Sequence, residues 1–155
     1  MDAAPRVDLT EYLPGLAGGQ MHVANLPYET LTETLRKLGF TVYTISGNLV
    51  LDEHAFFDHA VTVFGFPASI QRTWEAWDEY LLQFFRTQAA ARVAVVWKEA
   101  DLSFNLDART FLLAVEDLHD TAYNVERGLL KGAPPCQVEL FILGIGSGFR
   151  RPAVG

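Results

Sequence analysis

The sequence has little cysteine and no long apolar run. Its 155 residues contain one cysteine, Cys136, so an internal disulfide is excluded, and its place beside a strand-like run favours packing over chemistry. No apolar segment approaches the roughly 20 residues that a membrane-spanning helix needs. Residues 1–15 also lack the cationic start and apolar run of a signal peptide. We therefore expect a cytoplasmic protein with no membrane partner.

Basic residues are also scarce. Lysine and arginine together number 12 against 19 aspartates and glutamates, which gives a formal net charge of −7. Residues 52–79 hold six acids and one arginine, a local net charge of −5. Nucleic-acid binding relies on lysines and arginines that neutralise phosphates, so we expect no direct nucleic-acid partner. The charge balance favours a cationic protein partner instead.

The chain length predicts a single domain with one sizeable core. Prolines and glycines without periodicity make residues 1–20 an expected loose lead-in, and residues 145–155 an expected flexible tail. Residues 21–144 then form the domain. MHVAN is expected to be its first strand. Thr30 and Glu33 form a possible capping box at the start of the next helix, which stops at Gly39.

Strands and helices alternate through the rest of the domain. TVYTI alternates as a strand, and Asp52 is a good N-cap for a helix over residues 53–64. RVAVVW is a valine-rich apolar run typical of a strand buried on both faces, and the polar DLSFNLD after it is assigned to no helix or strand. Asp107 then caps a long helix, and QVELFIL is a last buried strand. The fold class is therefore α/β, with a small parallel β-sheet flanked by helices and an added N-terminal strand-helix unit.

The helix that contains TWEAWDEYL carries an unusual concentration of acids. Ser69 is its expected N-cap, and one apolar face predicts its core side; that face contains Ile70, Trp74, Trp77, Leu81 and Phe84. Glu75, Asp78 and Glu79 are neighbours on the solvent side, where like charges cost about 0.2 to 0.5 kcal/mol per pair. With a start at Ser69 they lie beyond the first turn, so the helix dipole does not offset this repulsion.

Two explanations fit this acidic face. The first is an ordinary solvated surface, in which a basic group such as Arg72 or Arg86 compensates the acids from within the chain. The second is a binding surface whose compensating basic group belongs to a partner.

Residues 41–144 resemble the barstar family of intracellular ribonuclease inhibitors, a resemblance that covers about two thirds of the chain. The element order matches in turn: TVYTI, DEHAFFDHAVTVFG, FPASIQRTWEAWDEYL, VAVVWK, RTFLLAVEDLHD and VELFIL. The family's motif is a proline, an aromatic-glycine turn, then asparagine, an aromatic or leucine, Asp, Ala, Leu, Trp, Asp and, one residue later, Leu. Its ungapped counterparts here are Pro67, then Thr73, Trp74, Glu75, Ala76, Trp77, Asp78, Glu79 and Leu81.

The resemblance implies a barstar-like fold with its core in residues 41–144, and a function in protein binding. In the family a carboxylate takes the place of the substrate phosphate in a cationic nuclease site, and Glu79 occupies that position here. The implied partner-binding residues on this helix and just before it are Gln71, Thr73, Glu75, Asp78, Glu79 and Tyr80. Acids of the last helix assist in the family, and the nearest ones here are Glu116, Asp117 and Asp120. The aromatic-glycine turn is ASIQ in this chain and the asparagine is Thr73, so the partner surface differs from the family pattern.

The expected function is therefore an inhibitor or immunity protein that blocks a ribonuclease or a similar basic toxin. The alternative is a barstar-fold scaffold or regulatory binding protein without a nuclease target. We expect no catalytic residues and no cofactor. His54 and Asp58 have metal-ligand spacing on one helix, but the sequence offers no third ligand beside them, so no metal site is expected either.

Overall fold

A four-stranded parallel sheet forms the centre of the molecule. The computed structural model describes residues 4–13, 15–16 and 19–149. The strand order is β1-β4-β3-β2, and every pair of neighbours is parallel. The strands are β1 (Met21–Ala24), β2 (Thr41–Ser46), β3 (Arg92–Lys98) and β4 (Gln137–Leu143). The predicted α/β class with a small parallel sheet is therefore confirmed.

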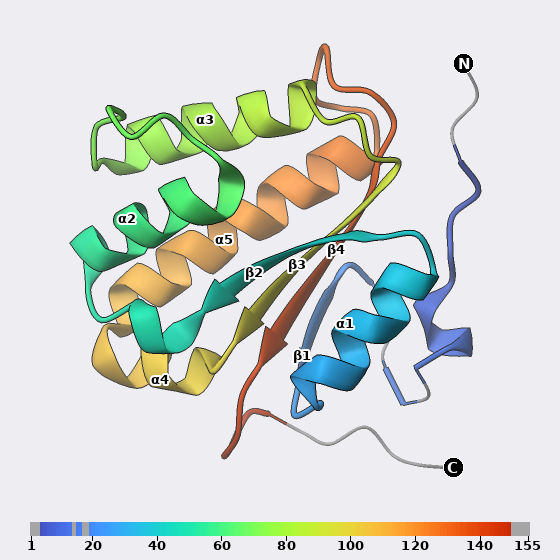
Figure 1. The fold of residues 1–155 in the computed structure, drawn as a ribbon, viewed down its shortest axis with the longest axis horizontal. Helices are drawn as coiled ribbons and strands as arrows, with labels where there is room; N and C mark the ends of the chain where they lie inside the picture. Colours follow the sequence, from blue (N-terminus) through green and yellow to red (C-terminus); the bar gives the residue numbers. More distant parts are fainter. Residues whose placement is uncertain (1–3, 14, 17–18, 150–155) are drawn as a thin grey trace.

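Helices cover both faces of this sheet (Figure 1). One face carries α1 (Tyr28–Lys37), and the other carries α2 (Glu53–Phe64), α3 (Trp74–Arg86) and α5 (Ala108–Glu126). A short α4 (Ala100–Leu106) follows β3, and two 3-10 turns, η1 (Leu9–Glu11) and η2 (Gly47–Leu49), complete the elements. The added N-terminal unit, β1 with α1, belongs to the same sheet, because β1 pairs with β4, and the buried residues of α1 lie in the core on one face of that sheet.

The two faces have separate cores. Between the sheet and α2, α3 and α5, the rings of Phe56, Trp77 and Trp97 are almost fully buried and stack or meet edge to face. On the other face, Leu35 of α1 packs against Phe141 of β4. Every residue of β4 is buried, as its apolar run predicts.

The helix starts confirm some predicted caps and correct others. The side chains of Asp52 and Asp107 accept the expected hydrogen bonds at the starts of α2 and α5. Ser69 is not the cap of α3: Thr73 is, and its hydroxyl accepts from the amide of Ala76 at 3.1 Å. The capping box in α1 is also wrong, because that helix begins at Tyr28 after Pro27, with no side-chain cap.

The polar stretch after β3 is a helix that the sequence did not reveal. The indole N–H of Trp97 donates to Ser103 Oγ at 3.1 Å, and this hydroxyl donates to the carbonyl of Gly47 at 3.1 Å. Both side chains are fully buried. This bridge fixes α4 against β3 and η2, a tertiary contact that local composition does not reveal.

The described part of residues 1–20 differs from the expected loose lead-in. Leu9 is buried in the core on the α1 side, and the side chain of Gln137 bonds both the amide (2.8 Å) and the carbonyl (2.9 Å) of Val7. Arg92 also donates to the carbonyl of Pro5 at 2.7 Å. Residues 5–9 therefore form a strap over the sheet.

One residue of the predicted tail (residues 145–155), Phe149, is partly buried and packs against the core formed with α2, α3 and α5. Residues 150–155 lie outside the described residues. Within the described ranges, no helix is both long enough and apolar enough to cross a bilayer.

Candidate functional site

A hollow rich in carboxylates lies between α3 and α5. Its volume is about 290 Å³. The lining residues are Trp74 and Asp78 from α3, and Leu113, Glu116, Asp117 and Asp120 from α5. Four of these six side chains are acids.

Helical spacing explains how these side chains meet. Trp74 and Asp78 are four residues apart, so they lie on one side of α3. The α5 residues recur at intervals of three, one and three from Leu113, which places them along one side of that helix. The buried residues beside them, Trp77 on α3 and Ala114 and Leu118 on α5, hold the two helices together.

Asp117 is the most perturbed acid of the hollow. Its partial burial and the Asp78 carboxylate within hydrogen-bonding reach are the main causes that raise the pKa of its carboxyl group to about 7. Asp120 contributes in the same direction, whereas the nearby indole of Trp77 opposes the shift. Asp117 therefore keeps its proton to a much higher pH than an ordinary aspartate, because its pKa is about 7.

No cation of the described residues forms an ion pair with Asp78, Glu116, Asp117 or Asp120. Arg72 instead binds Asp58 at 2.8 Å and the carbonyl of Ile70 at 2.7 Å. Arg86 donates to the carbonyl of Lys131 at 3.0 Å. The two arginines that could have compensated the acids from within the chain are therefore engaged elsewhere.

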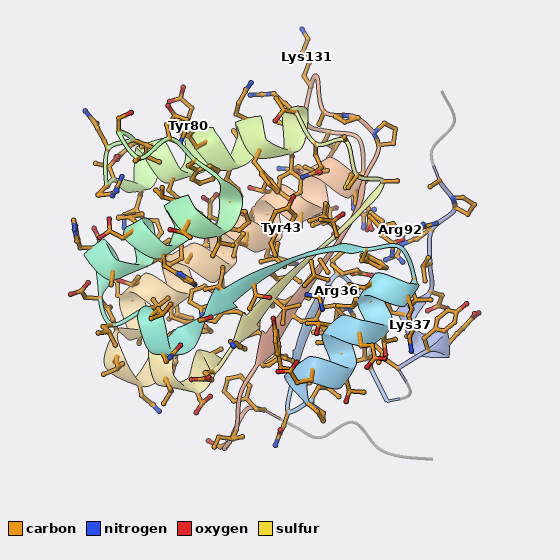
Figure 2. The ribbon with its side chains drawn as sticks, in the orientation of Figure 1. Arg36, Lys37, Tyr43, Tyr80, Arg92 and Lys131 are labelled. Carbon is orange, nitrogen blue, oxygen red and sulfur yellow. The ribbon has the colours of Figure 1, made fainter. Side chains whose placement is uncertain are left out.

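Other basic side chains also lie away from the hollow. Figure 2 places Arg36 and Lys37 on α1, across the sheet from α3 and α5. Lys37 pairs with Glu33 on its own helix at 3.1 Å.

The structure brings together four of the acids that the sequence resemblance implied: Asp78, Glu116, Asp117 and Asp120. Glu79, the expected centre, is exposed on α3 and does not line the hollow. Glu75 is also exposed, and because α3 begins at Trp74 it lies in the first turn, where the helix dipole favours a negative charge. The expectation that all three acids lie beyond the first turn is therefore wrong for Glu75.

The other predicted contact residues have different surroundings. Thr73 caps α3, and Tyr80 is half-buried against Phe66, with ring centroids 5.6 Å apart. Gln71 is exposed and precedes the helix. None of the three lines the hollow.

Sequence analysis missed two apolar members of the site, Trp74 and Leu113. Trp74 was assigned to the core stripe, but it is only half-buried, and its indole N–H is buried without a hydrogen-bond partner among the described residues. Trp74 lies four residues before Asp78, and this spacing could have indicated that the two side chains share one side of the helix.

The histidines of α2 have structural partners. His54 Nε2 lies 3.3 Å from Asp58, whose carboxylate also binds Arg72, and this arginine lowers the pKa of Asp58. His59 Nε2 accepts a hydrogen bond from the amide of Ser46 at 2.9 Å. Within the described part of the chain, no three His, Cys, Asp or Glu side chains are grouped so as to hold a metal ion.

Comparisons with known proteins do not extend this description. No protein-family model matches the chain, and no curated protein matches it significantly. The resemblance to the barstar family therefore rests on the motif and on the order of the elements.

Proposed function

We propose that this protein is an inhibitor or immunity protein that blocks the cationic active site of a ribonuclease or a similar basic toxin. The observation that carries the proposal is the uncompensated set of acids between α3 and α5: Asp78, Glu116, Asp117 and Asp120. Like charges this close repel one another, and a cation from a partner relieves the repulsion.

The chemistry suits a nuclease as the partner. A ribonuclease holds the substrate phosphate among cationic side chains, and a cluster of carboxylates offers the same negative charge in the same place. Binding a lysine or arginine would lower the pKa of Asp117 again, because a nearby positive charge favours the ionised carboxylate. The hollow has apolar walls in Trp74 and Leu113, and an indole face also attracts a cation.

The centre of the proposed surface is the pair Asp78 and Asp117, whereas the family resemblance alone assigned it to Glu79. Glu79 and Glu75 lie exposed on the same helix outside the hollow. Their contribution is long-range attraction, which speeds encounter with a basic partner and weakens with salt.

The element order gives the proposal further support. β2, α2, α3, β3, α5 and β4 follow one another as in the family's pattern, and α4 is inserted before α5. The scaffold alternative would act through the added N-terminal unit, β1 with α1, which is part of the same sheet.

The test is an inhibition assay with purified small basic bacterial ribonucleases. The intact chain should inhibit one of them, and the double variant Asp78→Asn/Asp117→Asn should bind at least about 100-fold more weakly, since losing one carboxylate from a buried interfacial pair costs about 2 to 5 kcal/mol. The matched control is Glu29→Gln/Glu33→Gln, which removes the same charge from α1 and should change the inhibition constant by less than about threefold. The proposal fails if the intact chain inhibits none of these enzymes, or if both double variants lose inhibition equally.

A further inference from the structure

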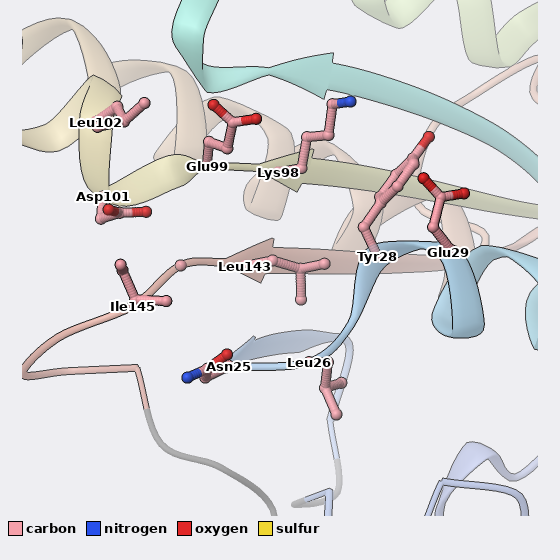
Figure 3. A pocket seen from close by; sticks show the side chains of 11 residues that line it. Asn25, Leu26, Tyr28, Glu29, Lys98, Glu99, Asp101, Leu102, Leu143 and Ile145 are labelled. Atoms are coloured by element: carbon pink, nitrogen blue, oxygen red, sulfur yellow. The ribbon is translucent and has the colours of Figure 1, made fainter.

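A second hollow lies at the carboxyl ends of the sheet strands, where β1, β3 and β4 end (Figure 3). Its volume is about 450 Å³, within the range of small-molecule sites. The lining side chains that matter for its chemistry are Leu26, Tyr28, Glu29, Lys98, Asp101 and Leu143. It shares no residue with the hollow between α3 and α5.

The chain topology makes this a favoured place for a ligand. The connection that leaves β1 runs through α1 on one face of the sheet, and the connection that leaves β3 runs through α4 and α5 towards the other face. β4 lies between these two strands, so the connections diverge around its end. Open parallel sheets bind their ligands in the crevice that such a divergence leaves at the carboxyl ends of the strands.

The walls of this hollow carry charges of both signs without internal partners. Lys98 Nζ lies 4.7 Å from the ring centroid of Tyr28, and neither this lysine nor Glu29, Glu99 or Asp101 forms an ion pair with another described residue. Figure 3 shows Lys98 pointing toward Tyr28 and Asp101 on the other side of the hollow, with Glu99 between them and Leu143 below Lys98. The site therefore offers one place for an anion and another for a cation.

This arrangement excludes several ligand classes. A phosphate compound would meet three carboxylates and one lysine, a net charge that repels it. A metal ion needs converging ligands, and no suitable group of three exists among the described residues. A wholly apolar molecule would bury charged groups without pairing them, which is costly.

We propose that this hollow binds a free α-amino acid, with basic amino acids preferred. The ligand's α-carboxylate pairs with Lys98, its aliphatic part contacts Leu26 and Leu143, and the side-chain ammonium of a basic amino acid reaches Asp101 on the other side of the hollow. The α-ammonium then adds a second positive charge, which suits the excess of acids from Glu29 and Glu99. This site is independent of the proposed inhibitor function.

The experiment is a titration of the isotope-labelled protein with L-lysine, L-leucine, putrescine and glutarate, followed by amide chemical shifts in NMR spectra. L-Lysine should give saturable shifts at residues 25–29, 98–102 and 143–145, with L-leucine weaker. Putrescine, which lacks the carboxylate, and glutarate, which lacks the ammonium, should each bind at least about tenfold more weakly than L-lysine, because each loses one charge-assisted pair.

Single substitutions test whether L-lysine binds in this hollow. Lys98→Met and Asp101→Asn should each weaken L-lysine binding about tenfold or more, while Asp78→Asn in the other hollow should leave it unchanged. The spectrum of each variant reports its fold directly, and Asp101→Asn, a near-isosteric change, serves as the test should Lys98→Met unfold.

Three results would overturn the proposal. The first is the absence of a saturable shift up to about 10 mM L-lysine, a concentration well above a millimolar dissociation constant. The second is putrescine binding as tightly as L-lysine with no effect of Lys98→Met, which would mean simple attraction of cations to acids. The third is loss of binding in Asp78→Asn, which would place the ligand between α3 and α5.

Discussion

Replacing Asp117 with asparagine should stabilise the protein at neutral and alkaline pH. The free energy of unfolding depends on pH wherever the folded and unfolded states bind different numbers of protons. The pKa of Asp117 rises from 3.8 to about 7 on folding, so between these values the folded state keeps a proton that the unfolded state has released. The contribution of this carboxyl group is therefore most favourable below pH 4, and it is lost as the pH rises towards 7.

The magnitude follows from the size of the shift. Three pKa units correspond to about 4 kcal/mol, and we expect about half of this, because Asp117 is partly exposed and solvent screens its interactions. Asparagine has the shape of the protonated acid and does not titrate. The variant should therefore match the parent within about 0.5 kcal/mol at pH 4.5 and exceed it by about 2 kcal/mol at pH 8.

The assay is urea unfolding followed by tryptophan fluorescence at several pH values, compared between Asp117→Asn and the parent so that the other titrating groups cancel. Glu79→Gln is the matched control, since it removes one exposed acid of α3 outside the hollow and should give a difference that varies little with pH. The reasoning would be refuted if the difference for Asp117→Asn were the same at pH 4.5 and pH 8, or if it favoured the parent at pH 8.

Three further predictions concern the fold. A β-carbon on Gly47 would overlap the backbone carbonyl of Glu99, so Gly47→Ala should lower the free energy of unfolding by about 3 kcal/mol, visible as a lower urea midpoint; an unchanged midpoint would contradict this packing. Burial lowers the pKa of His59, so the contribution of this histidine to the free energy of unfolding is present above pH 6.5 and is lost as the pH falls. In His59→Gln the new side chain can still accept from the Ser46 amide but does not titrate. The variant should therefore show a smaller drop in urea midpoint than the parent from pH 7 to pH 5. Burial raises the pKa of the Cys136 thiol to about 11, so a thiol reagent at pH 8 should label it only after unfolding; rapid labelling of the folded protein would show that the thiol is accessible.

Periodicity predicted the fold class because each strand and most helices carry their own signal. The apolar runs at 92–97 and 137–143 identified the two central strands, and Asp52 and Asp107 identified two helix starts. The failures occurred where distant contacts decide the local structure. α4 forms around the bridge from Trp97 through Ser103 to Gly47, which joins segments about 50 residues apart and leaves no pattern in DLSFNLD.

The candidate site was predictable only in part, for a similar reason. Helical spacing placed acids together on one helix, and this signal selected Glu75 and Glu79 along with Asp78. Which of these acids meets the acids of α5 depends on how the two helices pack, and only Asp78 lies on that side. Motif alignment assigned the centre to Glu79, but alignment carries no information about the rotation of a helix against its neighbour.

The buried acid Glu139, unlike the acids between α3 and α5, has an arginine beside it. Glu139 lies in the middle of β4 with 1% of its surface exposed, a position that the apolar pattern of QVELFIL does not flag. Its Oε1 atom lies 3.5 Å from Arg6 and 3.3 Å from the side-chain amide of Gln137, and its Oε2 atom lies 3.5 Å from His22. The strap at residues 5–9 thus supplies a cation to the one acid that the sheet buries completely.

The acids between α3 and α5 receive no such cation from the residues that the structure describes, although arginines lie close by in sequence. Arg72 precedes α3 and Arg86 ends it, yet both are bound to other groups, and the nearest neighbour that perturbs Asp117 is another carboxylate. Glu139 has a cation beside it, whereas Asp78 lies beside another carboxylate, Asp117. Replacing either Asp78 or Asp117 with asparagine would remove this contact between like charges and should stabilise the fold. The proposed partner would supply the positive charge that the described residues do not place beside these two acids.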